Sequence, residues 1–232
     1  MKEAKKVVFI NPEYKEFVIN RYIPCELRDY VNQKSIIIPN GVNDFWLKNK
    51  AKKYGWNNKK QINLIYVGDF SKNKNITTSI NVAKKLKKLG YTIHFSIIGS
   101  LGVEEYRIKQ LARKNKDIIK IFPRFEDKKN LLGMYRKSDI FIMPSFHETF
   151  GLVYLEAMSQ GLPVIYSKGQ GIDGYFKDGK VGYSVNPRSI DGIVEKIEMI
   201  ITNFDKISEN CYNSVEKFSW DEVGKMYQKI YI

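Results

Sequence analysis

The chain has 232 residues and fits one large domain or two small ones, because domains usually contain about 100–200 residues. With 43% hydrophobic, 13% aromatic and 28% charged residues, it has enough apolar surface for a core, which excludes a wholly disordered chain. A net charge of +14 favours an anionic partner, namely nucleic acid, a membrane surface or a phosphate-bearing ligand, and charge alone does not choose among them.

Cysteine content and hydropathy bear on the compartment. Cys25 and Cys211 are too few for a disulfide scaffold, and their separation matches no metal-ligand spacing. No run approaches the roughly 18 consecutive apolar residues of a membrane span. We therefore expect a cytoplasmic protein, with peripheral attachment at the inner face of the membrane as an alternative.

The first 60 residues differ in pattern from the rest. They are predicted to contain a short strand, a polar helix, and the turn signal Pro39-Asn40-Gly41. We expect too few elements here for a separate sheet. The lysine-rich residues 49–60 are typical of a connector.

From residue 61 onward, short β-rich runs alternate with helical patterns. Strands are predicted at 62–68, 93–99, 118–121, 139–145 and 163–166. Helices are predicted between them at about 76–89, 104–114, 129–136 and after Gly151, followed by a series of helices from 189 to the end. This alternation predicts an α/β fold with a doubly wound, Rossmann-like parallel sheet, which binds ligands beyond the carboxyl ends of its strands.

The loop that leaves the first of these strands runs Gly68-Asp69-Phe70-Ser71-Lys72-Asn73-Lys74-Asn75 and opens a helix. Gly68 allows a close backbone turn, the helix start presents free N–H groups, and Lys72 and Lys74 add positive charge, which together suit a phosphate. The loop matches neither GxGxxG nor a Walker motif. The alternative interpretation is a solvated lysine-rich turn.

A second segment, residues 144–165, reads PSFHETFGLVYLEAMSQGLPVI. Glu148 lies in the loop after a strand and Glu156 two turns into the next helix. Eight residues span about 12 Å along a helix, so the two acids suit opposite ends of an elongated ligand. Phe150, Gly151 and Leu152 bring main-chain N–H groups to the helix start, a further place for a phosphate.

An ordinary alternative exists for both acids: Glu148 as a helix cap and Glu156 as an exposed helix residue. Glu156, however, stands in an otherwise apolar row, where a carboxylate is costly unless it is paired or bound to ligand. The row therefore favours a functional role for Glu156.

Together these segments resemble the retaining nucleotide-sugar glycosyltransferases of the glycosyltransferase B fold, the group 1 family. The resemblance covers residues 34–232. It rests on IIIPNGVNDFW, IYVGDFSKNKN, SDIFIMPSFHETFGLVYLEAM with its Glu-x7-Glu spacing, and GLPVIYSKGQGIDGYFKDGKVGYSVNP. It implies two doubly wound domains that face a cleft, the C-terminal one binding the donor and the N-terminal one the acceptor.

The resemblance also implies roles for individual residues. Lys74 falls on the lysine that neutralises the donor diphosphate, Glu148 on the acid beside the transferred sugar, and Glu156 on the acid that holds the ribose hydroxyls. A carboxylate accepts hydrogen bonds from two hydroxyls, and an ammonium group stabilises the charge that develops on the diphosphate. The backbone that approaches sugar and phosphate is implied at Gly68, Phe150, Gly151 and Leu152.

Two positions depart from the family pattern. Asp69 stands where the family often has arginine, so Lys72 becomes the candidate second cation, and Asp173 stands where the family often has glutamate. His147 is a candidate sugar contact or a structural residue. No Asp-x-Asp occurs, so no metal site and no cofactor are predicted, and the lysines and helix starts would replace a divalent ion.

The resemblance predicts four parts of the chain: residues 1–45 as a remnant of the N-terminal acceptor domain, 46–60 as a linker, 61–218 as the donor-binding domain, and 219–232 as a C-terminal crossover helix. The chain is then either part of a longer chain or half of a split enzyme. An uncovered interdomain surface would favour self-association.

The leading hypothesis is the donor-binding part of a retaining, metal-independent hexosyltransferase that uses a nucleoside diphosphate sugar and a glycan or lipid-linked acceptor in surface polysaccharide synthesis. The alternative is a non-catalytic nucleotide-sugar-binding subunit that needs a separate acceptor-binding chain. Nucleic acid is not an expected partner, because only seven of the 39 basic residues are arginine and no known binding motif occurs.

Overall fold

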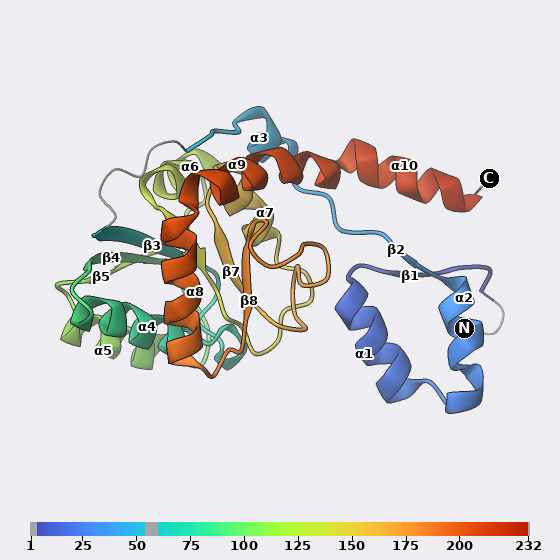
Figure 1. Cartoon of the computed structure of the whole chain (residues 1–232), viewed down its shortest axis with the longest axis horizontal. Helices are drawn as coiled ribbons and strands as arrows, with labels where there is room; N and C mark the ends of the chain where they lie inside the picture. Colours follow the sequence, from blue (N-terminus) through green and yellow to red (C-terminus); the bar gives the residue numbers. More distant parts are fainter. Residues whose placement is uncertain (1–3, 54–59, 232) are drawn as a thin grey trace.

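The computed structural model describes residues 4–53 and 60–231. Its larger part is built on a six-stranded sheet with the order β5-β4-β3-β6-β7-β8, in which all neighbours are parallel (Figure 1). The strands are β3 (Gln61–Val67), β4 (Thr92–Ile98), β5 (Ile119–Phe122), β6 (Ile140–Ile142), β7 (Val164–Ser167) and β8 (Gly182–Val185). The predicted doubly wound parallel sheet is confirmed. Its order reverses between β3 and β6, the usual place for a ligand in such sheets.

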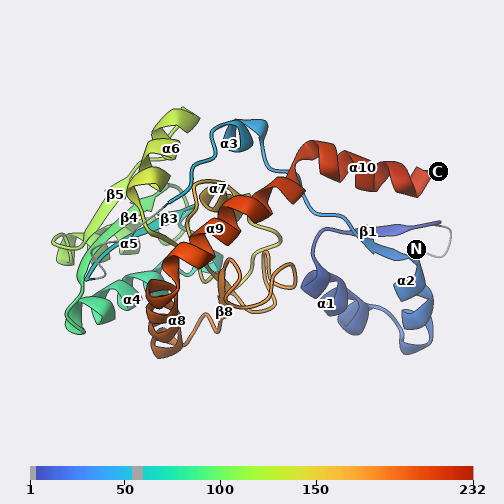
Figure 2. The ribbon, with the colours of Figure 1, turned by 45° about the horizontal axis from the view of Figure 1, so that its top comes forward.

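Helices cover both faces of this sheet, as Figures 1 and 2 show. One face carries α4 (Ile76–Lys88), α5 (Glu105–Lys114) and α8 (Ile190–Thr202), and the other carries α6 (Lys128–Lys137) and α7 (Leu152–Ser159). Helices α3 (Asp44–Lys48) and α9 (Phe204–Ser214) pack against α7. Because the sheet is buried on both sides, its central strands are almost wholly apolar. A continuous apolar core extends from Val42 to Phe218.

Strand β8 was not among the predicted elements. Its sequence, GYSV, contains glycine and serine, which are poor strand formers, so the local signal is weak. Gly182 approaches β7 so closely that a Cβ atom there would lie 1.8 Å from the carbonyl oxygen of Val164, with φ at +144°. The pairing of β8 with β7 therefore needs glycine at position 182. This pairing adds an edge strand that no residue pattern in the sequence predicts.

The N-terminal part contains a second, two-stranded sheet. Parallel strands β1 (Val7–Phe9) and β2 (Ser35–Ile37) are joined by α1 (Pro12–Tyr22), the 3-10 turn η1 (Cys25–Leu27) and α2 (Arg28–Lys34). The expectation that these residues hold too few elements for a sheet was wrong. The connection through two helices is long enough to bring the strands together in parallel.

Two stretches of chain connect the N-terminal part to the six-stranded part, and these stretches lie side by side. Val42 forms a parallel bridge with Ser219, and its N–H donates to the carbonyl oxygen of Phe218 at 2.7 Å. The chain reaches this point through the 3-10 turn η3 (Val215–Phe218) and continues into α10 (Trp220–Tyr231), which extends towards the N-terminal part (Figure 2).

The predicted linker, residues 46–60, begins inside α3. Trp46 of that helix is buried, and its ring meets Tyr135 edge-on at 5.5 Å between centroids. Residues 54–59 of the predicted linker lie outside the described residues. The predicted domain boundaries stay a prediction.

Candidate functional site

The candidate site lies where the sheet order reverses, at the carboxyl ends of β3 and β6. The loop after β3 contains the 3-10 turn η2 (Lys72–Lys74), and the loop after β6 runs to Gly151, where α7 begins. The two loops are joined directly, because the N–H of Phe146 donates to the carbonyl oxygen of Asn73 at 2.7 Å. Asn75, in the left-handed conformation at φ +52°, adds a side-chain hydrogen bond to the carbonyl oxygen of Pro144 at 2.9 Å.

Lys74 and Glu148 meet at this junction. The Nζ atom of Lys74 lies 2.6 Å from Oε2 of Glu148, and both side chains are largely buried. The structure thus brings together the lysine and the acid that the sequence indicated separately. A charge-assisted hydrogen bond of this length fixes both groups.

The backbone of Glu148 is held by the glycine-rich loop after β7. Its N–H donates to Oε1 of Gln170 at 3.0 Å, and its carbonyl oxygen accepts from the N–H of Gly171 at 2.8 Å. Gly171 has φ +63°, and a Cβ atom there would lie 3.3 Å from Cγ of Glu148. Gln170 was not predicted, because this contact joins distant segments and leaves no local pattern.

The start of α7 supplies main-chain donors. Gly151 has φ +75°, and its lack of a side chain lets the ring of Tyr154 lie where a Cβ atom would be, at 2.5 Å. In the part of the chain that the structure describes, the N–H groups of Leu152 and Val153 make no hydrogen bond. Free N–H groups at a helix start attract an anion.

These groups line a cavity of ≈ 400 Å³, here called the helix-end cavity. It is lined by residues that include Gly68, Lys74, Glu148, Phe150, Gly151 and Leu152. All six were candidates from the sequence. Asp69 also lines it, and its carboxylate accepts a hydrogen bond from the N–H of Ser71 at 2.9 Å, which shapes the loop.

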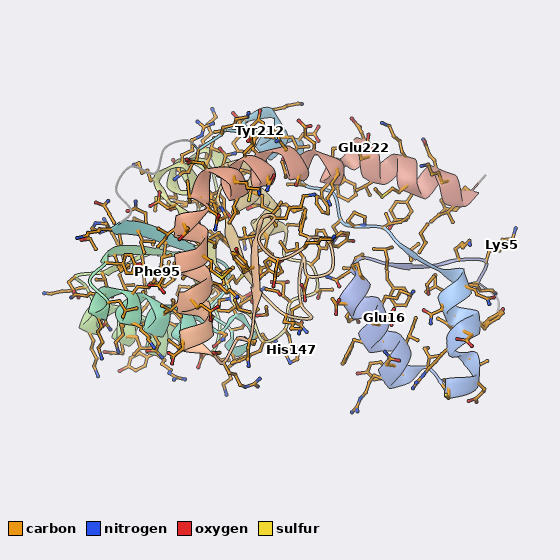
Figure 3. The ribbon with its side chains drawn as sticks, viewed as in Figure 1. Lys5, Glu16, Phe95, His147, Tyr212 and Glu222 are labelled. Atoms are coloured by element: carbon orange, nitrogen blue, oxygen red, sulfur yellow. The ribbon has the colours of Figure 1, made fainter. Side chains whose placement is uncertain are left out.

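A neighbouring cavity of ≈ 390 Å³, here called the aromatic cavity, shares Asp69, Lys74 and Glu148 with the first. His147 lines it and is exposed, which is compatible with the predicted sugar contact. Figure 3 shows His147 on the side of the six-stranded part that faces α1, the helix that carries Glu16. Helix α1 contributes Tyr14 and Phe17 to this cavity, and neither was predicted.

Glu156 lies apart from both cavities. Its Oε2 atom accepts a hydrogen bond from the hydroxyl of Tyr135 at 3.2 Å. Burial raises the pKa of Glu156, and Tyr135, the nearby indole of Trp46 and the charge of Lys128 oppose that rise only in part. The Trp46 N–H makes no hydrogen bond within 3.5 Å. Its effect on the pKa of Glu156 therefore comes from its nearness alone.

Two further sequence candidates do not join the site. Lys72 is exposed and lines neither cavity. The carboxylate of Asp173 accepts a hydrogen bond from the N–H of Gly169 at 2.6 Å and so stabilises the glycine-rich loop. Neither side chain lines the cavities that Lys74 and Glu148 line.

The described residues lack two features, a membrane-spanning helix and a metal-binding cluster. No helix among them is both long and apolar enough to cross a bilayer. Residues 4–53 and 60–231 also contain no group of three or more histidine, cysteine, aspartate or glutamate residues placed to hold a metal ion.

Comparison with known proteins identifies the family of these segments. The family model for glycosyl transferases group 1 matches residues 47–218. An uncharacterized glycosyltransferase of Methanocaldococcus jannaschii is 26% identical over 99% of this chain and 60% of its own length. The capsular polysaccharide biosynthesis glycosyltransferase CapM of Staphylococcus aureus is 29% identical over 70% of this chain and 44% of its own length.

The fold has close counterparts among solved structures. The sucrose-phosphate synthase from Thermosynechococcus elongatus superposes with a TM-score of 0.75 at 23% identity, over 99% of this chain and 59% of that one. This likeness shows that the architecture is that of the glycosyltransferase B fold. The chain spans about 60% or less of the length of these relatives.

Proposed function

Since the chain belongs to the glycosyl transferases group 1 family, we propose that it is the C-terminal, donor-binding part of a retaining glycosyltransferase. The donor is a nucleoside diphosphate sugar, the transferred group a hexose, and the acceptor a glycan or lipid-linked glycan of a surface polysaccharide. The relationship to a capsular polysaccharide glycosyltransferase supports that setting.

The contact between Lys74 and Glu148, at the reversal of the strand order, is the observation that carries this proposal. A lysine and the free N–H groups of Leu152 and Val153 line one cavity, which suits a diphosphate. As the bond between the anomeric carbon and the diphosphate oxygen breaks, negative charge grows on that oxygen. Lys74 stabilises this charge, which lowers the barrier.

Glu148 is proposed to hold the hydroxyls of the transferred sugar beside the reacting carbon. No second carboxylate is assigned as nucleophile, so the acceptor hydroxyl attacks the face that the diphosphate leaves, and its proton passes to the departing phosphate oxygen. The configuration at the anomeric carbon is then retained. The chain supplies cationic and N–H groups for this step, and no cofactor or metal ion is part of the proposal.

Glu156 is proposed to accept hydrogen bonds from the two ribose hydroxyls. Its burial without a basic partner at ion-pair distance supports this role, since ligand hydroxyls would replace the hydrogen bonds to water that the carboxylate has lost. The hydroxyl of Tyr135 satisfies only one of its acceptor sites. The remaining acceptor capacity is what we propose binds the ribose.

Calorimetric titration of the chain with UDP, ADP and GDP tests the proposal. We expect one of the three to bind, and binding to weaken at least about tenfold in Lys74→Ala and in Glu156→Ala. Lys88→Ala, an exposed lysine at the far end of α4, is the matched control and should bind like the wild type. Equal binding by all four proteins would refute the assignment.

The alternative to this proposal is a non-catalytic nucleotide-sugar-binding subunit that works with a separate acceptor-binding chain. Mixing the chain with candidate partner chains and measuring sugar transfer distinguishes the two. Transfer by the chain alone would exclude the alternative. Attachment at the inner membrane face and self-association through uncovered surface remain proposals, tested by vesicle sedimentation and by sedimentation velocity.

A further inference from the structure

The aromatic cavity has two chemically different walls. Lys74, His147 and Glu148 give it charged and hydrogen-bonding groups from the loops after β3 and β6. Tyr14 and Phe17 give it two aromatic rings from α1. A cavity of a few hundred Å³ that combines aromatic side chains with a few convergent polar groups is typical of a small-ligand site.

Packing within α1 does not explain why Tyr14 and Phe17 are exposed. They stand three residues apart on one face of α1, 43% and 54% exposed, with ring centroids 6.3 Å apart and planes inclined by 26°. Isolated exposed aromatic residues are ordinary on protein surfaces. Tyr14 and Phe17 differ from such residues, because their two nearly parallel rings both line a cavity that also holds the candidate site.

The position of α1 is tied to that of Glu148 through the glycine-rich loop. The side chain of Asn11, which is 1% exposed, accepts a hydrogen bond from the N–H of Tyr14 at 2.9 Å and donates one to the carbonyl oxygen of Gly171. The N–H of Gly171 in turn donates to the carbonyl oxygen of Glu148. Three consecutive hydrogen bonds therefore join the backbone of Tyr14 to that of Glu148.

Two further contacts hold α1 in the same position relative to the glycine-rich loop. The hydroxyl of Tyr175, which follows the same loop, donates to the carbonyl oxygen of Ile10 at 2.6 Å. Gly174 lies against Pro12, and a Cβ atom at Gly174 would be 3.1 Å from the proline ring. These contacts hold the two rings at a fixed distance from the polar wall. A surface that is only covered by another protein would not need such contacts.

We propose that Tyr14 and Phe17 form the acceptor platform of the site, on which a pyranose ring of the acceptor glycan stacks. A pyranose has an apolar face of C–H groups and a rim of hydroxyls, and it matches a cavity with one aromatic wall and one polar wall. The C–H face packs on the negative faces of the rings, and the hydroxyls reach the polar wall at His147. This inference rests on the proposed function, because it takes the diphosphate and the transferred sugar to occupy the Lys74 side.

Saturation-transfer NMR on the chain with UDP, ADP or GDP bound tests the platform, using maltose, cellobiose and chitobiose as probes. We expect at least one disaccharide to receive saturation at its ring C–H protons. Tyr14→Ala with Phe17→Ala should reduce this signal at least fivefold, and Tyr14→Phe with Phe17→Tyr should preserve it. Tyr106→Ala, an exposed aromatic residue on α5 that lines neither cavity, is the control.

A leucine pair separates stacking from simple apolar contact. Tyr14→Leu with Phe17→Leu keeps an apolar wall but removes the aromatic faces, and it should lose the signal as the alanine pair does. Retention of the signal in the leucine pair would overturn the proposal, because the sugar would then be held without the aromatic faces. Absence of binding by all three disaccharides to a chain that binds a nucleotide would also overturn it.

The same proteins distinguish failure of the platform from failure of the proposed function. Nucleotide binding measured by calorimetry should be unchanged in the alanine and leucine pairs, because Tyr14 and Phe17 do not line the helix-end cavity. Loss of nucleotide binding in these variants would contradict the separation of donor and acceptor sides. A wild-type chain that binds no nucleotide refutes the proposed function itself.

Discussion

The ammonium group of Lys74 is bound by the carboxylate of Glu148 at 2.6 Å, inside the cavity where a diphosphate is proposed to bind. A diphosphate that binds Lys74 must therefore displace the carboxylate of Glu148. The two anions compete for one cation, and this competition leads to the first prediction.

Replacement of Glu148 by glutamine should not weaken nucleoside diphosphate binding, and we expect binding to tighten by about two- to tenfold. The neutral amide no longer competes for Lys74 and no longer repels the phosphates. Transfer to an acceptor, once one is found, should fall by at least about 100-fold, because the group beside the reacting carbon is altered. Calorimetry measures the first effect and product formation the second; a tenfold loss of nucleotide affinity in this variant would contradict the account.

Glu156→Gln should raise stability at neutral pH while it weakens nucleotide binding. Burial raises the pKa of this carboxyl group, so the folded state holds its proton more tightly than the unfolded state. The wild type therefore loses stability as pH rises from about 4.5 through the raised pKa, and glutamine does not. Thermal melts at pH 4 and pH 7.5 should show a stabilising effect of the substitution that is larger at the higher pH, and an equal effect at both would count against it.

Gly151→Ala should destabilise the fold and disturb the helix-end cavity. The new Cβ atom would meet the ring of Tyr154 at 2.5 Å, in a backbone conformation with φ +75° that disfavours side chains. We expect a loss of about 2–4 kcal/mol. Gly133→Ala, inside α6 with no atom near the added methyl group, is the matched control and should stabilise by up to about 1 kcal/mol.

Denaturant titrations of both glycine variants measure these effects. The comparison is informative because the two substitutions add the same atom. Equal free energies of unfolding for the two variants would mean that the constrained start of α7 is not the source of the difference.

Only one of the two thiols should react with a disulfide reagent in the folded protein. Cys25 is exposed, whereas Cys211 is buried, donates to the carbonyl oxygen of Val181 at 3.2 Å, and has its pKa raised by burial. Colorimetric thiol titration should give one fast equivalent, which is absent in Cys25→Ala, and a second equivalent only on unfolding. Fast reaction of both thiols without denaturant would contradict the burial of Cys211 in α9.

The sheet could be predicted because each strand and helix carries its own periodicity. The strand at 62–68 and the helix from Ile76 follow directly from local apolar spacing, and they agree with β3 and α4. Strand β8 could not be predicted in the same way, because Gly182 and Ser184 have low strand propensity. The strand forms through its pairing with β7, which requires glycine at position 182. The parallel pairing of β1 with β2 depends on a crossover and leaves no local pattern.

The candidate site shows the same division. The residue types of Lys74 and Glu148 and their places after strands could be predicted from the sequence, but their contact depends on β3 and β6 being neighbours, which only the strand order provides. Tyr14 was missed because its significance comes from a cavity formed with residues of distant segments, from Asp69 to Gln170. The burial of Glu156 was foreseen in its apolar row, whereas its partner Tyr135 was not.

The two chain connections between the N-terminal part and the six-stranded part run side by side at Val42 and Ser219, where a hydrogen bond joins them. The contacts of Asn11 and Ile10 with the glycine-rich loop are separate from this bridge. They hold α1, with Tyr14 and Phe17, against the loop that also contacts the backbone of Glu148. Loss of those two hydrogen bonds would therefore release one wall of the aromatic cavity without breaking either chain connection.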